Sequence, residues 1–213
     1  MFNHIQKLSI TILSLFIFVF AANADINLPT PQTKEGMGIF DALKRRSSTP
    51  GGGFGVGNVS DQELSTLLWA ASGLNRGKRG WTVPMANGKP PYVRIYVAGE
   101  NGVFRYEWDG QYLQEISTND IRGDIGQQAF TKRAAYSLIF VTDGTALADF
   151  NDNEKANNFS QIAVGAMSQN MYLAAASLKL NVRYIHSIKP EIIRTELKLA
   201  DNDQPIGIML LGK

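Results

Sequence analysis

The stretch from Asn153 to Lys179 constrains the fold of this 213-residue chain more than any other feature. It runs for 27 residues without a proline, and apolar residues recur along it with the period of an α-helix. Much of it consists of small side chains, which suit close packing against another element. These small residues are Ala163, Gly165, Ala166, Ala174, Ala175 and Ala176. We therefore expect one long central helix.

Segments on both sides of this helix have the alternation and the turn residues of β-strands. Shorter helices are also expected, one of them beginning with a capping box at Ser60–Glu63. The sequence thus predicts an α+β fold with a mostly antiparallel sheet. The expected strands cover residues 92–98, 103–108, 112–116, 136–142, 181–187 and 206–211, with Asp109-Gly110 as a hairpin turn, and the expected short helices cover residues 39–46, 61–73, one or two parts of 119–132, and 190–197.

Residues 1–24 have the pattern of a secretory signal peptide. Lys7 gives a positive start, residues 8–21 are mostly apolar, and Ala22-Asn23-Ala24 fits the small residues of a cleavage site. The apolar run is short for a membrane span. We therefore expect cleavage before Asp25, an exported protein that is periplasmic or secreted, and no membrane attachment after cleavage.

The remaining residues predict an extended N-terminal arm over 25–35 and one domain over 36–213. Cysteine is absent, which excludes disulfides and thiol catalysis. His186 is the one histidine after residue 24, so neither a histidine-based zinc site nor a serine-histidine triad is expected. Beyond the signal segment the chain has 20 basic and 19 acidic residues, a balance that does not suggest a nucleic-acid binder.

Arg45-Arg46-Ser47 is a candidate phosphate-binding group at the end of the first predicted helix. Arginine offers a planar fork of donors that fits phosphate, and serine adds a hydroxyl donor. A basic helix end that faces solvent also suits the helix dipole, so surface charge is the alternative interpretation. The glycine-rich run Pro50–Gly57 follows, and it lacks the lysine of a nucleotide P-loop.

Five segments, in order along the chain, resemble the nitroreductase family of FMN-dependent oxidoreductases, in particular its short SagB-like branch. The resemblance extends from about Phe40 to Gly212. The segments that carry it are Arg45-Arg46-Ser47, Leu67–Asn75, Thr82-Val83-Pro84-Met85-Ala86, Gly165–Ala175 with its Gln169-Asn170 pair, and Leu210-Leu211-Gly212.

The resemblance implies a nitroreductase-like fold and a homodimeric flavoprotein, with the long helix and two FMN molecules at the interface of the chains. Hydride would pass from NAD(P)H to flavin N5 and then to an organic acceptor of the nitroaromatic or quinone type. Because the flavin carries the chemistry, no catalytic side chain and no metal are expected. The resemblance assigns the FMN phosphate and ribityl chain to Arg45, Arg46 and Ser47, the isoalloxazine edge to Pro84, Met85, Ala86 and Asn87, the pyrimidine or ribityl side to Gln128, and the flavin face or phosphate to His186 and Ser187.

Three positions depart from the family pattern. Thr49 stands where the phosphate motif usually has another basic residue, Met85 replaces the usual serine, and Lys89-Pro90-Pro91 falls where a polar residue is common. Many relatives also have a basic phosphate ligand after the last strand, a role for which Lys213 is the candidate here.

Other interpretations of the chain and of two of its residues stay open at this point. The chain is alternatively a flavin-binding or interaction protein without turnover, because NAD(P)H is scarce outside the cytoplasm, or a SagB-like dehydrogenase of a modified peptide or small molecule. Asn87 also suits a simple turn beside Gly88, and His186 suits a structural role.

Overall fold

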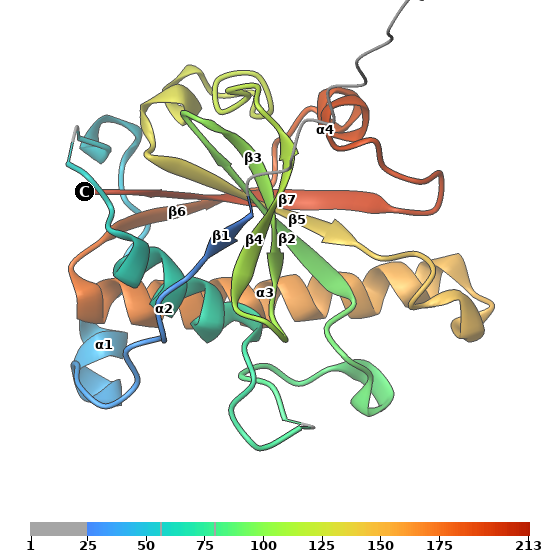
Figure 1. Cartoon of the computed structure of the whole chain (residues 1–213), viewed down its shortest axis with the longest axis horizontal. Helices are drawn as coiled ribbons and strands as arrows, with labels where there is room; N and C mark the ends of the chain where they lie inside the picture. The colour runs from blue at the N-terminus through green and yellow to red at the C-terminus, as the bar shows by residue number, and fades with distance from the viewer. Residues whose placement is uncertain (1–24, 56, 79) are drawn as a thin grey trace, which may run out of the picture.

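The structure is a computed structural model that describes residues 25–55, 57–78 and 80–213, so the expected signal peptide lies outside the described residues. Seven strands form one antiparallel sheet in the order β1-β4-β3-β2-β5-β7-β6 (Figure 1). This arrangement confirms the predicted α+β fold with an antiparallel sheet. The strands are β1 (Ile26–Asn27), β2 (Val93–Gly99), β3 (Gly102–Glu107), β4 (Tyr112–Ser117), β5 (Tyr136–Thr142), β6 (Asn181–Ile185) and β7 (Gln204–Gly212).

The predicted long helix is present as α3, which runs along one side of the sheet (Figure 1). Helix α1 lies at the end of α3 where α3 finishes, and α4 lies on the opposite side of the sheet (Figure 1). No helix within the described residues is both long and apolar enough to cross a membrane. The α-helices are α1 (Ile39–Arg45), α2 (Asp61–Ser72), α3 (Asn153–Leu178) and α4 (Pro190–Leu197), and the short 3-10 helices are η1 (Gly51–Gly53), η2 (Ala86–Gly88), η3 (Ala129–Arg133) and η4 (Ala148–Phe150).

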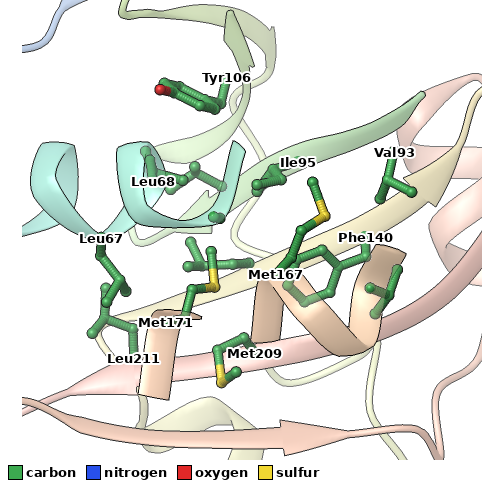
Figure 2. Packing of buried hydrophobic residues seen from close by; sticks show 14 of the residues in the cluster. Leu67, Leu68, Val93, Ile95, Tyr106, Phe140, Met167, Met171, Met209 and Leu211 are labelled. Carbon is green, nitrogen blue, oxygen red and sulfur yellow. The ribbon is translucent and has the colours of Figure 1, made fainter. Parts of the chain in front are cut away.

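The larger core cluster lies between α2, α3 and one face of the sheet. Leu67 and Leu68 of α2 meet Met167 and Met171 of α3 above the strands, and all four side chains are fully buried (Figure 2). A second cluster covers the other face of the sheet, where Ile193 of α4 packs. Because both faces are covered, the central strands have apolar residues in succession rather than strict alternation.

One side of α3 is buried in the core, and another side of the same helix is exposed. Met167 and Met171 point into the core, whereas Ile162, Gly165 and Gln169 are exposed. The spacing of these three residues places them on one stripe of the helix. Within the described residues, this stripe of α3 is therefore exposed to solvent.

Two local predictions differ from the structure. Of the one or two short helices expected over residues 119–132, the structure has one 3-10 helix, η3, which begins at Ala129. The preceding residues form turns, which Arg122 holds by donating to Asp120 and to the carbonyl oxygens of Ala134 and Ala135. The predicted hairpin is present, but its loop has four residues, Trp108–Gln111.

Candidate functional site

The chain leaves α1 as an extended segment that covers the free edge of β6. The Thr49 backbone N–H donates to the carbonyl oxygen of Val182 at 2.9 Å, and the Val182 N–H donates to Thr49 Oγ1 at 3.1 Å. These bonds satisfy backbone groups that an edge strand otherwise leaves open. Residues 46–49 are therefore fixed against the sheet although they lie outside any regular element.

Tyr172 of α3 connects the same segment to Tyr184, near the carboxyl end of β6. Its hydroxyl lies 2.8 Å from Ser48 Oγ and accepts from the Tyr184 N–H at 2.8 Å. The Arg46 guanidinium lies over the Tyr172 ring, 4.8 Å from the centroid, a cation–π arrangement. Since Ser48 is beside Tyr184 and Thr49 is beside Val182, the segment runs antiparallel to β6.

This direction brings five of the ten predicted site residues toward the same end of β6. Arg46 and Ser47 lie toward the carboxyl end of β6, where His186 and Ser187 follow the strand. Gln128 lies beside Ser187, because the neighbouring Gln127 N–H donates to the Ser187 carbonyl oxygen at 3.0 Å. His186 and Ser187 are both exposed. Three segments distant in sequence thus form one cluster, which we call the β6 cluster: Arg46, Ser47, Gln128, His186 and Ser187.

Two buried polar atoms of the β6 cluster have no partner within the described residues. They are Arg46 Nε and Gln128 Oε1. A buried polar group without a hydrogen bond costs about 1–3 kcal/mol. A guanidinium N–H suits a phosphate oxygen, and an amide suits the polar edge of a flavin ring. The residues present therefore fit a flavin nucleotide, and the two atoms would gain their missing partners from it.

Arg45 precedes the β6 cluster as the last residue of α1 and is exposed. Its position at a helix end agrees with either a phosphate ligand or a surface charge that suits the helix dipole. Arg46 differs because its backbone has left the helix and its side chain is partly buried against Tyr172.

The second predicted group, Pro84–Asn87, lies elsewhere on the same chain. The Ala86 N–H donates to the Tyr92 hydroxyl at 3.4 Å, and that hydroxyl donates to the Phe159 carbonyl oxygen at 3.3 Å. Phe159 and Tyr172 are separated by 13 residues of α3, which corresponds to about 20 Å along a helix. One chain therefore anchors the Ala86 end of this group and the Arg46–Ser48 segment at different levels of α3.

Two residues of the second group are positioned by local structure. Met85 is 9% exposed and belongs to the core, and its carbonyl oxygen accepts from the Gly88 N–H at 3.2 Å. Asn87 has a left-handed backbone with φ 55°, followed by Gly88 with φ 65°, as a tight turn requires. Asn170 of α3 fixes the segment that leads into this loop, since its amide donates to the carbonyl oxygens of Ala70 and Thr82 at 3.1 Å each.

Lys213 is held away from the β6 cluster. Its Nζ pairs with Glu63 at 2.8 Å, at the beginning of α2. Glu63 also accepts from Ser60 in the predicted capping box. Burial raises the pKa of Glu63, but the bonds from Lys213 and Ser60 outweigh it, and the net pKa lies below the ordinary value. Lys213 thus stabilises a helix end in this chain.

The sequence reasoning missed two residues that shape the β6 cluster, Tyr172 and Arg183. Arg183 is partly buried on β6, donates to the Thr49 carbonyl oxygen at 3.4 Å, and lies 5.3 Å from the ring centroid of Phe130. Because side chains alternate along a strand, the sequence predicts that Arg183 lies on the opposite face of the sheet from Val182 and Tyr184. The sequence does not show which element packs against Arg183 on that face.

One cavity in the described part of the chain lies apart from these residues. It has a volume of about 710 Å³ and lies between Phe54, Leu64, Phe104 and Tyr136. None of the ten predicted site residues lines it. The described residues also contain no group of three or more histidine, aspartate or glutamate side chains that would hold a metal ion.

Comparison with known proteins identifies the family. The model of the nitroreductase family matches residues 54–213. A solved structure of a nitroreductase candidate from Ralstonia eutropha JMP134 is 30% identical, with a TM-score of 0.82, and the match covers 89% of each chain. The nitroreductase candidate MJ1384 of Methanocaldococcus jannaschii is 26% identical over 161 residues, which cover 71% of this chain and 80% of the relative.

A more distant match shows the same fold. The structure of an NADPH:FMN oxidoreductase from Vibrio harveyi, complexed with NAD+, is 19% identical with a TM-score of 0.58, and the match covers 82% of this chain and 67% of the other. The family model covers well over half of the sequence, and its range includes Gln128, His186 and Ser187. The chain belongs to the nitroreductase family.

Proposed function

We propose that this chain is an exported FMN-dependent oxidoreductase that passes hydride from NAD(P)H or another reduced donor to a nitroaromatic or quinone acceptor. The observation that carries the proposal is the pair of unpartnered buried atoms, Arg46 Nε and Gln128 Oε1, in one cluster of a nitroreductase-family fold. The structural relative described as an NADPH:FMN oxidoreductase supports the choice of cofactor and donor.

Each member of the β6 cluster has a distinct task in this proposal. Arg46 and Ser47 bind the phosphate and the ribityl chain, with Arg45 adding charge at the end of α1. Gln128 binds the polar edge of the ring, and the segment at His186 and Ser187 borders its face. Bound FMN supplies hydride transfer through N5, so the protein supplies position and electrostatics.

We propose that the site is completed by a second copy of the chain. The supporting observation is that Ala86 is tied to α3 at Phe159 whereas the Arg46–Ser48 segment is tied to it at Tyr172, about 20 Å away along the helix. In a two-fold dimer, Pro84–Asn87 of one protomer meets the β6 cluster of its partner. The surface around α1 and α3 suits such a contact, because Phe40 is 84% exposed and Ile162 is 65% exposed. Gly165 adds room, since a Cβ built on it meets no described residue within 4 Å.

Export follows from the pattern of residues 1–24. Electrons would then come from whichever reduced donor reaches the compartment, with NAD(P)H as the first candidate. N-terminal sequencing of material expressed and exported in a bacterium should begin at Asp25. Exported protein that begins at Met1 would contradict this part of the proposal.

Anaerobic reduction of the purified protein tests the cofactor and the activity together. Protein supplied with FMN should become yellow, and NADH or NADPH should bleach the flavin absorbance. Addition of a nitroaromatic compound or a quinone should then restore it. A protein that does not bind FMN overturns the proposal. If dithionite bleaches the bound flavin but neither NADH nor NADPH reduces it, the result favours the alternative of a flavin-binding protein without nicotinamide-dependent turnover.

A further inference from the structure

Helix α1 carries an apolar patch that the described residues of the protomer leave uncovered. Ile39 is 55% exposed, Phe40 84% and Leu43 47%, whereas Ala42 is the buried residue of this helix. Residues three and four apart are neighbours on a helix surface, so the three exposed side chains form one group, which we call the α1 patch. Large apolar side chains exposed together mark an interaction surface.

A pocket at the beginning of α3 offers a complementary surface. It has a volume of about 350 Å³, and Phe159 and the exposed Ile162 form its apolar part. We call it the α3 pocket, and its lining residues are Asp152, Glu154, Lys155, Asn158, Phe159 and Ile162. The pocket is therefore apolar at its centre and polar around it.

The charges beside the two surfaces are of opposite sign. Helix α1 ends with the exposed cations Lys44 and Arg45, and the α3 pocket has the exposed carboxylates of Asp152 and Glu154. None of the ion pairs within the described residues includes any of these four side chains. Such complementary charges favour one orientation of two surfaces over others.

The contacts of α3 indicate where a second copy places these surfaces. Ala86 is tied to α3 at Phe159. The Arg46–Ser48 segment is tied to α3 at Tyr172. The proposed shared site joins these two groups across the protomers, so Phe159 of one α3 reaches the level of the partner's Tyr172. Antiparallel α3 helices meet this condition when the two-fold axis passes beside Gly165, about halfway between the two residues.

The same axis brings α1 to the level of the partner's α3 pocket. The Met37 N–H, just before α1, donates to Ser177 Oγ at 2.8 Å, and Ser177 lies five residues after Tyr172. The axis therefore brings Ser177 to the level of the partner's Glu154, which lies five residues before Phe159. Helix α1, which lies between its two anchors on α3, thus spans the levels of the partner's pocket.

The two surfaces also lie on the same side of α3. Tyr172 lies three residues after Gln169, so it continues the exposed stripe that starts at Ile162 of the pocket. The Arg46–Ser48 segment covers this stripe at Tyr172, and α1 lies at the same end of α3 (Figure 1). Two α3 helices that meet along this stripe therefore bring each α1 against the beginning of the partner's helix.

We propose that the α1 patch of each protomer docks in the α3 pocket of its partner. Phe40, the most exposed side chain of the patch, lies in the apolar part of the pocket, against the partner's Ile162. Because Arg46 directly follows α1, the partner also fixes the residue that binds the FMN phosphate, so dimerisation and FMN binding favour each other. This inference rests on the proposed function, because the shared site gives the position of the axis.

Chemical crosslinking tests the contact, and the chain suits it because the sequence contains no cysteine. The double variant Phe40→Cys/Asn158→Cys places one thiol on the patch and one in the pocket, both at exposed positions. Within one protomer, the anchors of α1 at Tyr172 and Ser177 are about 20–30 Å along α3 from Asn158. A short bismaleimide therefore joins the two thiols only across protomers.

We expect the bismaleimide to convert most of the double variant to a covalent dimer on a denaturing gel. Each single variant should stay a protomer, because the two-fold axis places the two copies of either position at opposite ends of the helix pair. Phe40→Cys/Thr195→Cys is the matched control, with its second thiol exposed on α4 on the other side of the sheet, and it should also stay a protomer.

A second measurement uses Phe40→Ser, with Ile26→Thr on β1 as the control that also removes an exposed apolar side chain. The dimer dissociation constant of Phe40→Ser should rise at least about 10-fold. Its FMN affinity should fall in dilute solution and recover at protein concentrations that restore the dimer. Ile26→Thr should match the wild type in both respects.

The outcomes separate this inference from the proposed function. A wild-type dimer that binds FMN, together with a double variant that does not crosslink, would mean that something else covers α1 and would overturn the inference alone. A Phe40→Ser dimer as tight as the wild type would do the same. Wild-type protein that binds FMN as a monomer would overturn both the inference and the shared site. Wild-type protein that binds no FMN would overturn the proposed function.

Discussion

The guanidinium of Arg46 lies 4.8 Å from the ring centroid of Tyr172, whose hydroxyl is bonded to Ser48 and to the Tyr184 backbone N–H. One side chain of the long helix therefore holds the arginine, the segment that follows it and the edge of β6 in a single arrangement. Fixing a side chain before its ligand arrives reduces the entropic cost of binding. The phosphate motif is pre-organised in this chain through contacts that no short sequence pattern contains.

Replacement of Arg46 by alanine should weaken FMN binding about 10- to 100-fold, because a hydrogen bond to a charged group contributes roughly 1.5–3 kcal/mol. Riboflavin binding should change little, since riboflavin has no phosphate. Arg45→Ala should have a smaller effect, because Arg45 is exposed whereas Arg46 is partly buried with its Nε unpartnered. Fluorescence titration of both variants with both flavins measures this. Full FMN affinity in both variants would mean that the phosphate binds elsewhere.

Tyr172→Phe should destabilise the protein by about 1–3 kcal/mol, because it removes the acceptor of the Tyr184 N–H while leaving the ring under Arg46. FMN binding should also weaken, since Ser48 loses its anchor. Urea unfolding with and without FMN measures both effects. Tyr112→Phe on β4 is a matched control that removes a hydroxyl far from the cluster. Equal stability of the two variants would argue against this role of Tyr172.

Much of the fold was predictable because hydrophobic period and turn chemistry are local properties. Strand β5 and helix α4 begin and end at the predicted residues, and the capping box at Ser60 is present. Asp109-Gly110 predicted the hairpin but not its loop. There, the left-handed residue is Gln111, with φ 51°, whose amide bonds to Ser65 of α2. That contact joins residues 46 positions apart, so it follows from tertiary structure alone.

The candidate site was predictable only in its parts. Arg46 and Ser47 were identifiable as candidates from their chemistry, whereas Gln128, His186 and Ser187 were candidates only through the family resemblance. Their convergence depends on the antiparallel path of residues 46–49 along β6, which is set by bonds to Val182 and Tyr172. Such edge contacts have no periodic signature. The anchoring of Ala86 beside Phe159 likewise follows from tertiary contacts.

Gly165→Leu should dissociate the proposed dimer while leaving the protomer folded. Among the described residues of one chain, nothing lies within 4 Å of a Cβ at this position, and leucine favours a helix over glycine by up to about 1 kcal/mol. A larger side chain therefore causes no clash in the protomer and obstructs only a partner that approaches α3. Light scattering should show the mass of a single protomer, circular dichroism should show unchanged helix content, and fluorescence titration should show reduced FMN affinity.

The control for this variant is Thr195→Leu on α4, an exposed helical position on the opposite side of the sheet. It adds an apolar side chain of the same size and should leave the mass in solution unchanged. A Gly165→Leu protein that remains dimeric with full flavin occupancy would show that α3 does not form the interface.

Glu63→Gln should lower stability at neutral pH by less than about 1 kcal/mol, because the glutamine keeps a capping acceptor but loses the ion pair with Lys213. The pKa of Glu63 is lowered in the folded chain from 4.5. Its stabilisation is therefore present above the unfolded pKa and is lost as pH falls through the folded value. The difference between wild type and variant should shrink below about pH 4.5 and vanish in stronger acid. Urea unfolding between pH 3 and pH 7 measures it, with Glu35→Gln, an exposed carboxylate of the N-terminal arm, as the control. A difference that stays constant across this range would mean that the Lys213–Glu63 pair does not contribute.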